Sequence, residues 1–349
     1  MNSIMLQSPP PKVLLIKPSS LGDVVHALPV LDLLKRTWPA SHVSWLVTPA
    51  CAGLLQGHPL LDDVILFERG RLSTFWRSFR AAAGLFDLTR QLRQRQFDLV
   101  IDLQGLFRSG WLARRTAAPM RVGFADAREL AWMFYTHRID AGSREQHAVD
   151  RNLKLARALG CGDGPVAFPI PVDASAEESV NSMLGQPRRL AVLLPGATWP
   201  SKRWPADRFA ALVAPLKQRF GLDAVLAGGA DAAPIASRIS GALDLTGRTT
   251  LGQLVALLRR ADLVIANDSG PMHIAAALGR PLVAIFGPTN PLRTGPYGRP
   301  AAVVRVAKSC SPCYRRSRWR CRCIDQIQVE AVLSAAQQEL HAATPAVSD

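Results

Sequence analysis

The sequence is short of acidic residues and of long apolar runs. It has 42 lysines and arginines against 27 aspartates and glutamates, for a formal net charge of +15. No apolar run reaches the roughly 18 residues that a membrane-spanning helix requires. The first residues, MNSIMLQSPPPK, lack the charged start and apolar core of a signal peptide. We therefore expect a cytoplasmic protein whose six cysteines are reduced thiols or metal ligands.

Recognition motifs for nucleic acids are also missing. No zinc-finger, RNA-recognition or helix-turn-helix pattern stands out, so we expect no nucleic-acid partner. There is no P-loop pattern, and no Asp-x-Asp pair is present to hold a divalent ion against a diphosphate. The positive charge favours an anionic lipid surface or a phosphorylated substrate, and a surface charged only for solubility is the alternative.

Apolar runs alternate with helix-like stretches in two parts of the chain. The first part contains KVLLI, HVSWLV, DDVILF and FDLVID, and the second contains RLAVLL, DAVLAG, DLVIAN and PLVAIF. This order predicts an α/β protein with two doubly wound parallel sheets. Ligands bind at the carboxyl ends of the strands in such sheets, so we expect a central cleft between the two halves.

A segment rich in proline, glycine and acidic residues interrupts the pattern and marks a domain boundary. We divide the chain into an N-terminal domain (1–165), a linker (166–188), a C-terminal domain (189–323) and a last helical segment (324–349). The last segment could pack back on the N-terminal domain.

A lone carboxylate follows the first strand, in the stretch KPSSLGDVVHALP. Asp23 stands where a helix begins, and the free N–H groups of a helix start favour its charged form. An ionised carboxylate that faces a cleft can accept a proton from a hydroxyl nucleophile, and Gly22 allows another group to approach the backbone closely. The alternative is that Asp23 only caps the helix. The pattern alone leaves both interpretations open.

Small residues mark three strand-to-helix turns in the second half, in LPGATWPSKRWP, LAGGADAAP and NDSGPMHIAAALG. Such turns offer backbone N–H groups to a phosphate, and a nearby lysine adds a point charge. The alternatives are ordinary loops, a solvated lysine and a core histidine. Together the turns predict a nucleotide-diphosphate site. Its candidate residues are Thr198, Lys202, Asp268, Ser269, Gly270 and His273.

The two sets of residues suggest a division of labour between the halves. Displacing a sugar from a nucleotide diphosphate requires one base for the acceptor hydroxyl, and the departing diphosphate needs positive charge more than a proton. A hydrolase of glycosidic bonds would usually show a pair of carboxylates. We therefore expect Asp23 as the base, with Lys202 and the helix ends neutralising the diphosphate.

Several stretches resemble the ADP-heptose:lipopolysaccharide heptosyltransferase family. They are VLLIKPSSLGDVVHALPVL, FDLVIDLQGLFRSG, QHAVDRN, KRWP and NDSGPMHIAAALGRPLVAIFGPTNP, within about residues 12–298. The resemblance implies a GT-B fold of two Rossmann-like domains. It also implies an inverting, metal-independent transfer of L-glycero-D-manno-heptose from ADP-heptose to the lipopolysaccharide inner core.

The resemblance also suggests an acceptor. The segment GFADARELAWMFYTHRI looks more like the first heptosyltransferase, which adds heptose to Kdo-lipid A. The second enzyme, which extends that heptose, is the close alternative, and a protein heptosyltransferase is another. Two readings from other classes stay open: a sugar-nucleotide epimerase or hydrolase on the same fold, and a non-catalytic binding protein.

Site residues carry over from the family by position. Asp23 would be the general base, Arg128 would bind the acceptor, and Thr249 would lie where the backbone meets adenine. Ala197 stands where a second hydroxyl residue can occur, and Asp231 is the nearest acid for a ribose contact, which makes nucleotide preference less secure. The implied donor-binding set is Ser20, Gly22, Thr198, Lys202, Thr249, Asp268, Ser269, Gly270 and His273.

A basic segment with interleaved aromatic residues runs from Arg69 to Arg95. Its composition suits an anionic membrane surface, and a solvated helix with a half-buried aromatic stripe is the alternative. We expect Arg69 and Arg71 to contact the acceptor, and the protein to lie peripherally on the inner face of the inner membrane.

Four cysteines gather in CSPCYRRSRWRCRC. Cys310, Cys313, Cys321 and Cys323 could form a four-thiolate site for structural zinc or iron. The second pair is Cys-x-Cys, an awkward spacing for one ion, and catalysis in the family requires no cofactor. The alternative is a set of free thiols in a basic loop whose arginines contact phosphate.

Overall fold

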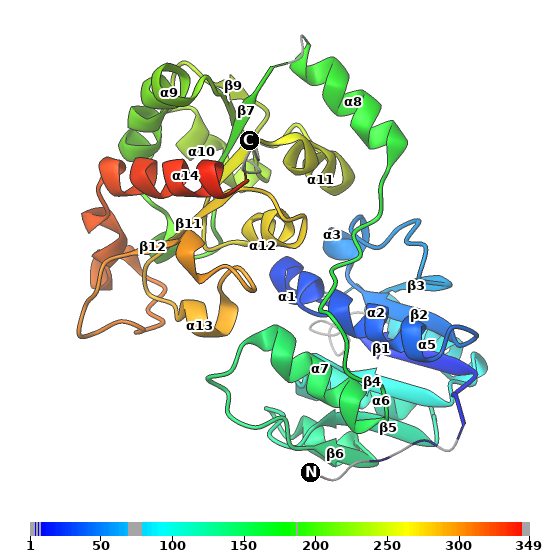
Figure 1. The fold of residues 1–349 in the computed structure, drawn as a ribbon. Helices are drawn as coiled ribbons and strands as arrows, with labels where there is room; N and C mark the ends of the chain where they lie inside the picture. The colour runs from blue at the N-terminus through cyan, green and yellow to red at the C-terminus, as the bar shows by residue number, and fades with distance from the viewer. Residues whose placement is uncertain (1–3, 5, 7, 69–78, 186–187, 344–349) are drawn as a thin grey trace, which may run out of the picture. The chain divides into compact units, whose positions relative to one another are not determined.

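The computed structural model describes residues 4, 6, 8–68, 79–185 and 188–343. The chain divides into two compact units, Met1–Pro171 and Val172–Asp349. Each unit contains one six-stranded parallel sheet with helices around it (Figure 1). The predicted α/β class with two doubly wound sheets is therefore confirmed. The boundary at Pro171 lies within the segment 166–188 that we predicted as a linker.

The N-terminal sheet has the strand order β3-β2-β1-β4-β5-β6. Its strands are β1 (Lys12–Ile16), β2 (His42–Val47), β3 (Asp63–Leu66), β4 (Leu99–Asp102), β5 (Met120–Phe124) and β6 (His137–Ile139). Its helices are α1 (Leu21–Val25), α2 (Leu28–Thr37), α3 (Pro49–Ala52), α5 (Phe79–Gln94), α6 (Phe107–Arg115), η1 (Ala131–Phe134) and α7 (Ala148–Ala158). The basic segment that we singled out from Arg69 to Arg95 contains α5, and its residues 69–78 lie outside the described ranges.

Strand β1 is apolar on both faces because helices cover both. Leu14 and Ile16 pack with Leu92 of α5 and Leu112 of α6. Val13 and Leu15 point to the opposite face, since side chains alternate along a strand, and they are also fully buried. A continuous run such as KVLLI is typical of a central parallel strand.

The C-terminal sheet has the strand order β12-β11-β10-β7-β8-β9. Its strands are β7 (Leu190–Leu194), β8 (Asp223–Leu226), β9 (Leu243–Asp244), β10 (Leu263–Asn267), β11 (Leu282–Phe286) and β12 (Val303–Arg305). The longer helices are α8 (Ala174–Leu184), α9 (Ala206–Phe220), α11 (Leu251–Arg260), α12 (Gly270–Ala277) and α14 (Val329–Ala343). Shorter helices are η2 (Pro200–Lys202), η3 (Ala230–Ala232), α10 (Ala233–Ala236), α13 (Pro291–Thr294), η4 (Pro300–Ala302), η5 (Arg318–Arg320) and η6 (Cys323–Gln326).

Register sets which turns are neighbours at the carboxyl edge of each sheet. In the N-terminal unit, Ile16 pairs with Leu46 on one side and with Asp102 on the other. In the C-terminal unit, Leu194 pairs with Ala266, and Asn267 pairs with Ile285. The residues that directly follow β1 and β4, and those that follow β7, β10 and β11, therefore lie side by side.

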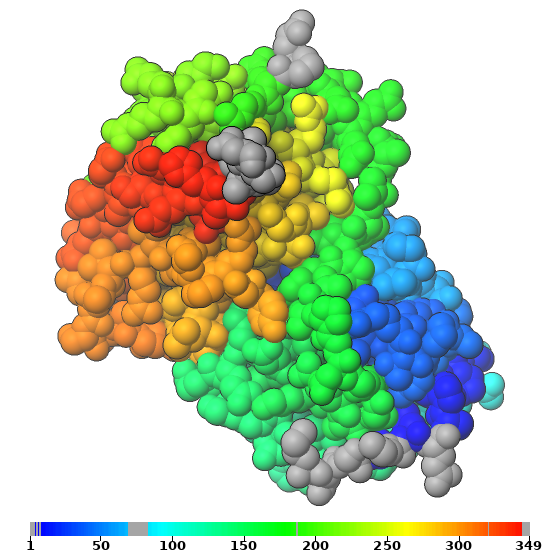
Figure 2. All heavy atoms as spheres, in the orientation of Figure 1, coloured from blue at the N-terminus to red at the C-terminus, as the bar shows by residue number. Residues whose placement is uncertain are grey.

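Two helices differ from the sequence prediction. Residues 174–184, which we assigned to the linker, form α8, which packs against α11 through a hydrogen bond from Gln253 Nε2 to Ser179 Oγ of 2.7 Å. The last helix, α14, packs on α9 and β11 and buries Val332 and Leu333 in the core of the C-terminal unit. Its apolar face is thus used within that unit, at whose surface it lies (red in Figure 2).

Within residues 4, 6, 8–68, 79–185 and 188–343, none of the helices combines the length and the apolar composition that a membrane span requires.

Candidate active site

Asp23 lies in the first turn of α1, directly beyond the carboxyl end of β1. Its Oδ2 accepts hydrogen bonds from the backbone N–H of Ser20 at 3.0 Å and from Ser20 Oγ at 2.7 Å. Its Oδ1 lies 4.0 Å from Lys17 Nζ, and 41% of the side chain is exposed. Asp23 therefore does cap the helix, but it does so with one oxygen and leaves the carboxylate accessible. The two interpretations that the sequence left open are compatible.

Lys17 is a residue that our sequence analysis missed. Its side chain is buried, and Nζ donates a 2.8 Å hydrogen bond to the carbonyl oxygen of Leu103, the residue after β4. The charge needs a partner because an isolated ammonium is costly to bury, and Asp23 Oδ1, 4.0 Å away, supplies an opposite charge. The signal available in the sequence was a lysine directly after the buried apolar run VLLI.

The turn after β4 is held by Asp102, which is fully buried. Its Oδ1 accepts from the backbone N–H groups of Gln104 at 2.9 Å and Gly105 at 3.2 Å, and its Oδ2 accepts from the Tyr135 hydroxyl at 2.7 Å. Burial raises the pKa of Asp102 above its usual value, although these hydrogen bonds oppose the shift. Asp102 thus positions the Leu103 carbonyl that binds Lys17.

Arg128 lies at the same edge of the N-terminal sheet. Its backbone N–H donates a 3.0 Å hydrogen bond to the Gly105 carbonyl oxygen, and its side chain is exposed. This exposed guanidinium lies at the sheet edge where β1 and β4 end, and it is available to an anionic ligand. The other two predicted acceptor residues, Arg69 and Arg71, lie outside the described residues.

In the C-terminal unit, Lys202 and Asp268 form an ion pair. Lys202 Nζ lies 2.7 Å from Asp268 Oδ2, which also accepts a hydrogen bond from Thr289 Oγ1. The carboxylate is 5% exposed and the lysine side chain 17%. The lysine also lies over the Trp199 ring, 4.6 Å from its centroid. Two residues that we predicted from separate motifs are therefore in direct contact.

Asn267 joins the two turns that carry this pair. Its Nδ2 donates to the Pro195 carbonyl oxygen at 2.8 Å, and its Oδ1 accepts from the Trp204 N–H at 3.1 Å. Gly196 is required in the first turn because a Cβ there would lie 2.9 Å from the Cβ of Ala232. Thr198 follows in the same turn and is exposed. Sequence analysis missed the bridging role of Asn267, which is fully buried.

Ser269, Gly270 and His273 lie at the start of α12. Ser269 is its N-cap, yet its buried Oγ makes no hydrogen bond to any residue that the structure describes. Buried hydroxyls are normally satisfied, so an orphaned one at a helix start fits a ligand with polar groups. His273 is buried in the first turn.

Thr249 and Asp231 lie in other parts of the C-terminal unit than the Lys202–Asp268 pair. Thr249 is half-buried just before α11, whose N-cap is Thr250. Asp231, in η3, is 64% exposed and lies 3.8 Å from Arg203 Nη2. No hydrogen bond or ion pair among the described residues joins either one directly to Lys202 or Asp268.

The cysteine segment brings three of its four thiols together. Cys321 Sγ lies 3.7 Å from Cys313 Sγ and 3.5 Å from Cys323 Sγ, whereas Cys310 is exposed. Burial and the neighbouring thiols raise the pKa of Cys321 to about 12. Across the described ranges, no group of three or more His, Cys, Asp and Glu side chains is arranged to hold a metal ion. The zinc or iron site that we predicted is not supported.

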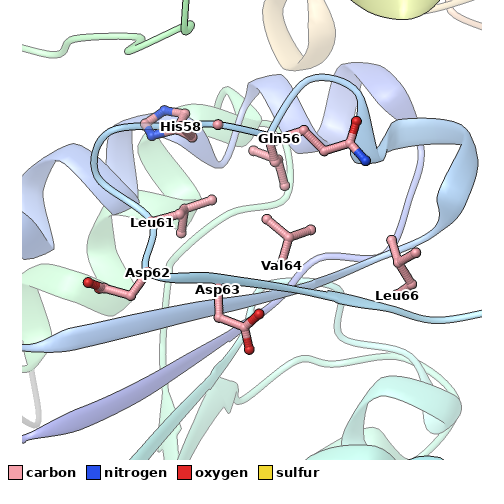
Figure 3. A pocket seen from close by; sticks show the side chains of 9 residues that line it. Gln56, His58, Leu61, Asp62, Asp63, Val64 and Leu66 are labelled. Atoms are coloured by element: carbon pink, nitrogen blue, oxygen red, sulfur yellow. The ribbon is translucent and has the colours of Figure 1, made fainter.

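A pocket of about 410 Å³ lies elsewhere in the N-terminal unit, between the α3–β3 connection and β3 (Figure 3). Two of its polar side chains, those of His58 and Asp62, already have partners. His58 Nε2 lies 2.7 Å from the Pro169 carbonyl oxygen, and Asp62 Oδ2 accepts from Val43 N–H at 2.7 Å and Lys35 Nζ at 2.9 Å. Against the effect of burial, these donors lower the pKa of Asp62. None of the predicted site residues lines this pocket.

The chain is similar to known heptosyltransferases over most of its length. Lipopolysaccharide heptosyltransferase 1 from Pseudomonas aeruginosa is 33% identical over 320 residues, which is 88% of this chain and 87% of that protein. Lipopolysaccharide heptosyltransferase 2 from Salmonella typhimurium is 30% identical and covers 84% of this chain and 88% of its own length.

A solved structure of E. coli heptosyltransferase WaaC with ADP superposes with a TM-score of 0.77 at 27% identity, covering 94% of this chain and 99% of that one. The GT-B type of fold expected from the resemblance is thereby confirmed. A sequence model of glycosyltransferase family 9 matches residues 85–321, which is more than half of the chain. The protein is therefore a glycosyltransferase and belongs to glycosyltransferase family 9, the heptosyltransferases.

Proposed function

We propose that this enzyme transfers L-glycero-D-manno-heptose from ADP-heptose to the Kdo-lipid A inner core of lipopolysaccharide, with inversion at the anomeric carbon. The observation that carries the proposal is the Asp23 carboxylate, which is exposed yet fixed by Ser20 and accompanied by the buried Lys17. The names of relatives at about 30% identity over most of the chain support the heptose donor and the lipopolysaccharide acceptor.

Asp23 acts as the general base. Its carboxylate accepts the proton of the acceptor hydroxyl as the oxygen attacks the anomeric carbon, and the bond to the diphosphate breaks on the opposite face of the sugar. Ser20 orients the carboxylate, and the Lys17 ammonium favours its charged form. A single base is sufficient because ADP is a good leaving group once its charge is neutralised.

The C-terminal unit binds the donor. Lys202 leaves or shares its ion pair with Asp268 to contact the diphosphate, which meets the backbone N–H groups at the start of α12. Thr198 and the orphaned Ser269 hydroxyl supply further hydrogen bonds. Asp268, Gly270 and His273 line the sugar and diphosphate, and Thr249 lies beside the adenine. In this scheme the N-terminal unit binds the acceptor.

The transfer needs no divalent ion in this proposal. The positive charge that the leaving diphosphate requires comes from Lys202 and from the amino end of α12. The check is a transfer assay with EDTA: the rate should stay within twofold of the untreated rate. A loss of activity that Mg²⁺ or Mn²⁺ restores would contradict metal independence and leave the assignment of Asp23 intact.

The acceptor is lipid-anchored, so we place the enzyme on the inner face of the inner membrane. Arg128 supplies an exposed cation for acceptor carboxylates or phosphates, and Arg69 and Arg71 are proposed to add more. Helix α5 supports a membrane contact because Phe86 is 64% exposed next to Arg90. Co-sedimentation with vesicles tests the contact: binding should rise with the fraction of anionic lipid, and equal binding to neutral vesicles would exclude it.

The decisive experiment offers ADP-heptose with three acceptors: Kdo-lipid A, heptosyl-Kdo-lipid A and a protein extract. Mass spectrometry should detect one added heptose on Kdo-lipid A and none with the Asp23→Asn variant. Consumption of ADP-heptose without any acceptor would instead indicate an epimerase or hydrolase. Binding of ADP with no turnover on any acceptor would indicate a non-catalytic binding protein.

A second candidate function is transfer to heptosyl-Kdo-lipid A. It is favoured by the similarity to lipopolysaccharide heptosyltransferase 2, whose identity and coverage are close to those of the type 1 relatives. The same acceptor panel separates the two functions. A type 1 enzyme adds heptose to Kdo-lipid A, whereas a type 2 enzyme adds it only to heptosyl-Kdo-lipid A, and the two products differ in mass by one heptose.

A further inference from the structure

The segment that contains the four cysteines, residues 310–323, is attached to the turn that carries Lys202. We call this segment the cysteine loop. Ser201 is fully buried; its Oγ donates to the Arg315 carbonyl oxygen at 2.6 Å, and its N–H donates to the Arg316 carbonyl oxygen at 3.3 Å. Arg318 Nη1 donates to the Arg203 carbonyl oxygen at 2.8 Å. The loop is therefore hydrogen-bonded to the residues immediately before and after Lys202 in the sequence.

The base of the loop also packs against the end of β11. Cys313 N–H donates to the Pro288 carbonyl oxygen at 3.0 Å, and Ser311 Oγ donates to that of Gly287 at 3.2 Å. A Cβ on Gly287 would lie 3.4 Å from Cys323 Sγ and 3.3 Å from the Ser201 carbonyl oxygen. Three buried or half-buried thiols pack together at this base. Cys313, Cys321 and Cys323 thus form a small core at the base of the loop.

This anchoring presents Arg316 beside Lys202. The Arg316 guanidinium carbon lies 4.9 Å from the centroid of the Trp199 ring, and Lys202 Nζ lies 4.6 Å from the same centroid. The two cations therefore cannot be farther apart than the sum of these distances. Lys202 is paired with Asp268, whereas Arg316 is exposed and has no carboxylate partner among the described residues.

Two cations on one indole ring repel each other, and only one of them is neutralised by a carboxylate. An anion bound at this point would relieve the repulsion and replace the missing partner. A guanidinium is well suited to a phosphate because its planar fork can donate two parallel hydrogen bonds. Trp199 limits the conformations of the arginine before any ligand arrives, which lowers the entropic cost of binding.

We propose that Arg316 is a second cation for the diphosphate of the nucleotide-sugar donor, presented by the cysteine loop. The inference rests on the donor site of the proposed function and extends it to a residue outside the predicted set. In this assignment Arg316 binds the donor, and Ser201 and Arg318 are positioning residues that hold the loop in place.

Calorimetric titration of the full chain with ADP tests the assignment. Arg316→Ala should raise the Kd for ADP about tenfold, the loss expected for one charge-assisted contact. The Kd of Arg316→Lys for ADP should lie between those of Arg316→Ala and the unaltered chain, because lysine keeps the charge but lacks the planar guanidinium. A higher salt concentration should reduce the difference in Kd between Arg316→Ala and the unaltered chain, since salt screens an exposed charge contact.

The matched control is Arg322→Ala, which removes an exposed arginine from the same loop and should change the Kd less than twofold. Adenosine, measured by ligand-observed NMR, should bind Arg316→Ala and the unaltered chain equally. If Arg316→Ala and Arg322→Ala bind ADP with equal affinity, the role of Arg316 is overturned while the proposed donor site still stands. Equal weakening of ADP and adenosine would reduce Arg316 to a structural role. Failure of the unaltered chain to bind ADP would overturn the donor site itself.

Discussion

Each unit of the protein has a lysine–aspartate pair beside the carboxyl ends of its strands, and the two pairs are built in opposite ways. In the N-terminal unit the lysine of the Lys17–Asp23 pair is buried and the aspartate is exposed. In the C-terminal unit the aspartate of the Lys202–Asp268 pair is the more deeply buried member. The pairs also differ in closeness, with 4.0 Å between the charged atoms in the first and 2.7 Å in the second.

The difference indicates which charge each unit offers to a substrate. The more deeply buried member of each pair is committed to the protein, while its less buried partner is the one that can exchange its contacts for a ligand. The N-terminal unit therefore presents a carboxylate, as a base requires. The C-terminal unit presents an ammonium, as a diphosphate requires. The predictions below test this comparison by removing one charge at a time.

The largest effect is expected from Asp23→Asn. The amide keeps the size of the side chain but cannot accept the acceptor proton, so kcat should fall at least ~10³-fold. The Kd for ADP should stay within twofold, because Asp23 makes no contact with the donor diphosphate in our proposal. Parallel rate and titration measurements check this. Joint loss of turnover and ADP binding would mean that Asp23 only maintains the fold.

Lys202→Met should mainly weaken binding of the donor. Loss of a charge-assisted contact to the diphosphate should raise the Kd for ADP about 30-fold. Lys202→Arg should recover part of the affinity because it keeps the charge. Calorimetry measures both, and an unchanged Kd in Lys202→Met would contradict the assignment.

This variant also leaves Asp268 without its cation, which can destabilise a buried carboxylate. Thermal unfolding of Lys202→Met is therefore measured beside its affinity. A double variant, Lys202→Met with Asp268→Asn, removes both charges. It should regain the stability of the unaltered chain but not its ADP affinity.

Lys17→Met should have a smaller effect, and on turnover rather than binding. The change removes the ammonium near Asp23 and the donor to the Leu103 carbonyl, so kcat should fall about tenfold. The Kd for ADP should stay within twofold, and Lys17→Arg should restore part of kcat. A variant that loses ADP affinity and thermal stability together, with kcat unchanged, would make Lys17 a purely structural residue.

The fold was largely predictable because its signals are local. Strands such as KVLLI and LVIAN are continuous apolar runs, and small residues mark the turns that follow them. Helix α8 was missed because proline, glycine and acidic residues dominate its surroundings, and its apolar contacts are on α11, far along the chain. A helix stabilised by tertiary contacts carries a weak local signal.

The sequence motifs single out candidate site residues one at a time, but they do not predict the contacts between those residues. Lys202 and Asp268 are 66 positions apart, and only the parallel register of β7 and β10 brings them together. Lys17 was missed, and Arg316 was not singled out among the arginines of the cysteine loop, for a related reason. Lys17 contacts the turn after β4, and Arg316 contacts Trp199. Both partners are far away in the sequence, so local patterns do not predict these contacts.

Asp102 holds the turn whose Leu103 carbonyl oxygen accepts a hydrogen bond from Lys17, and its own titration gives a further prediction. Its pKa is raised by burial, so the folded state holds this proton to a higher pH than the unfolded chain does. The stability that this difference contributes is present below the unfolded pKa and is lost as the pH rises through the folded pKa. Asp102→Asn cannot ionise. Its free energy of unfolding, relative to the unaltered chain, should therefore rise with pH above about 4, by at most ~1.4 kcal/mol per pH unit. Urea unfolding from pH 4 to 8 measures the difference, and a pH-independent one would show that Asp102 titrates alike in both states.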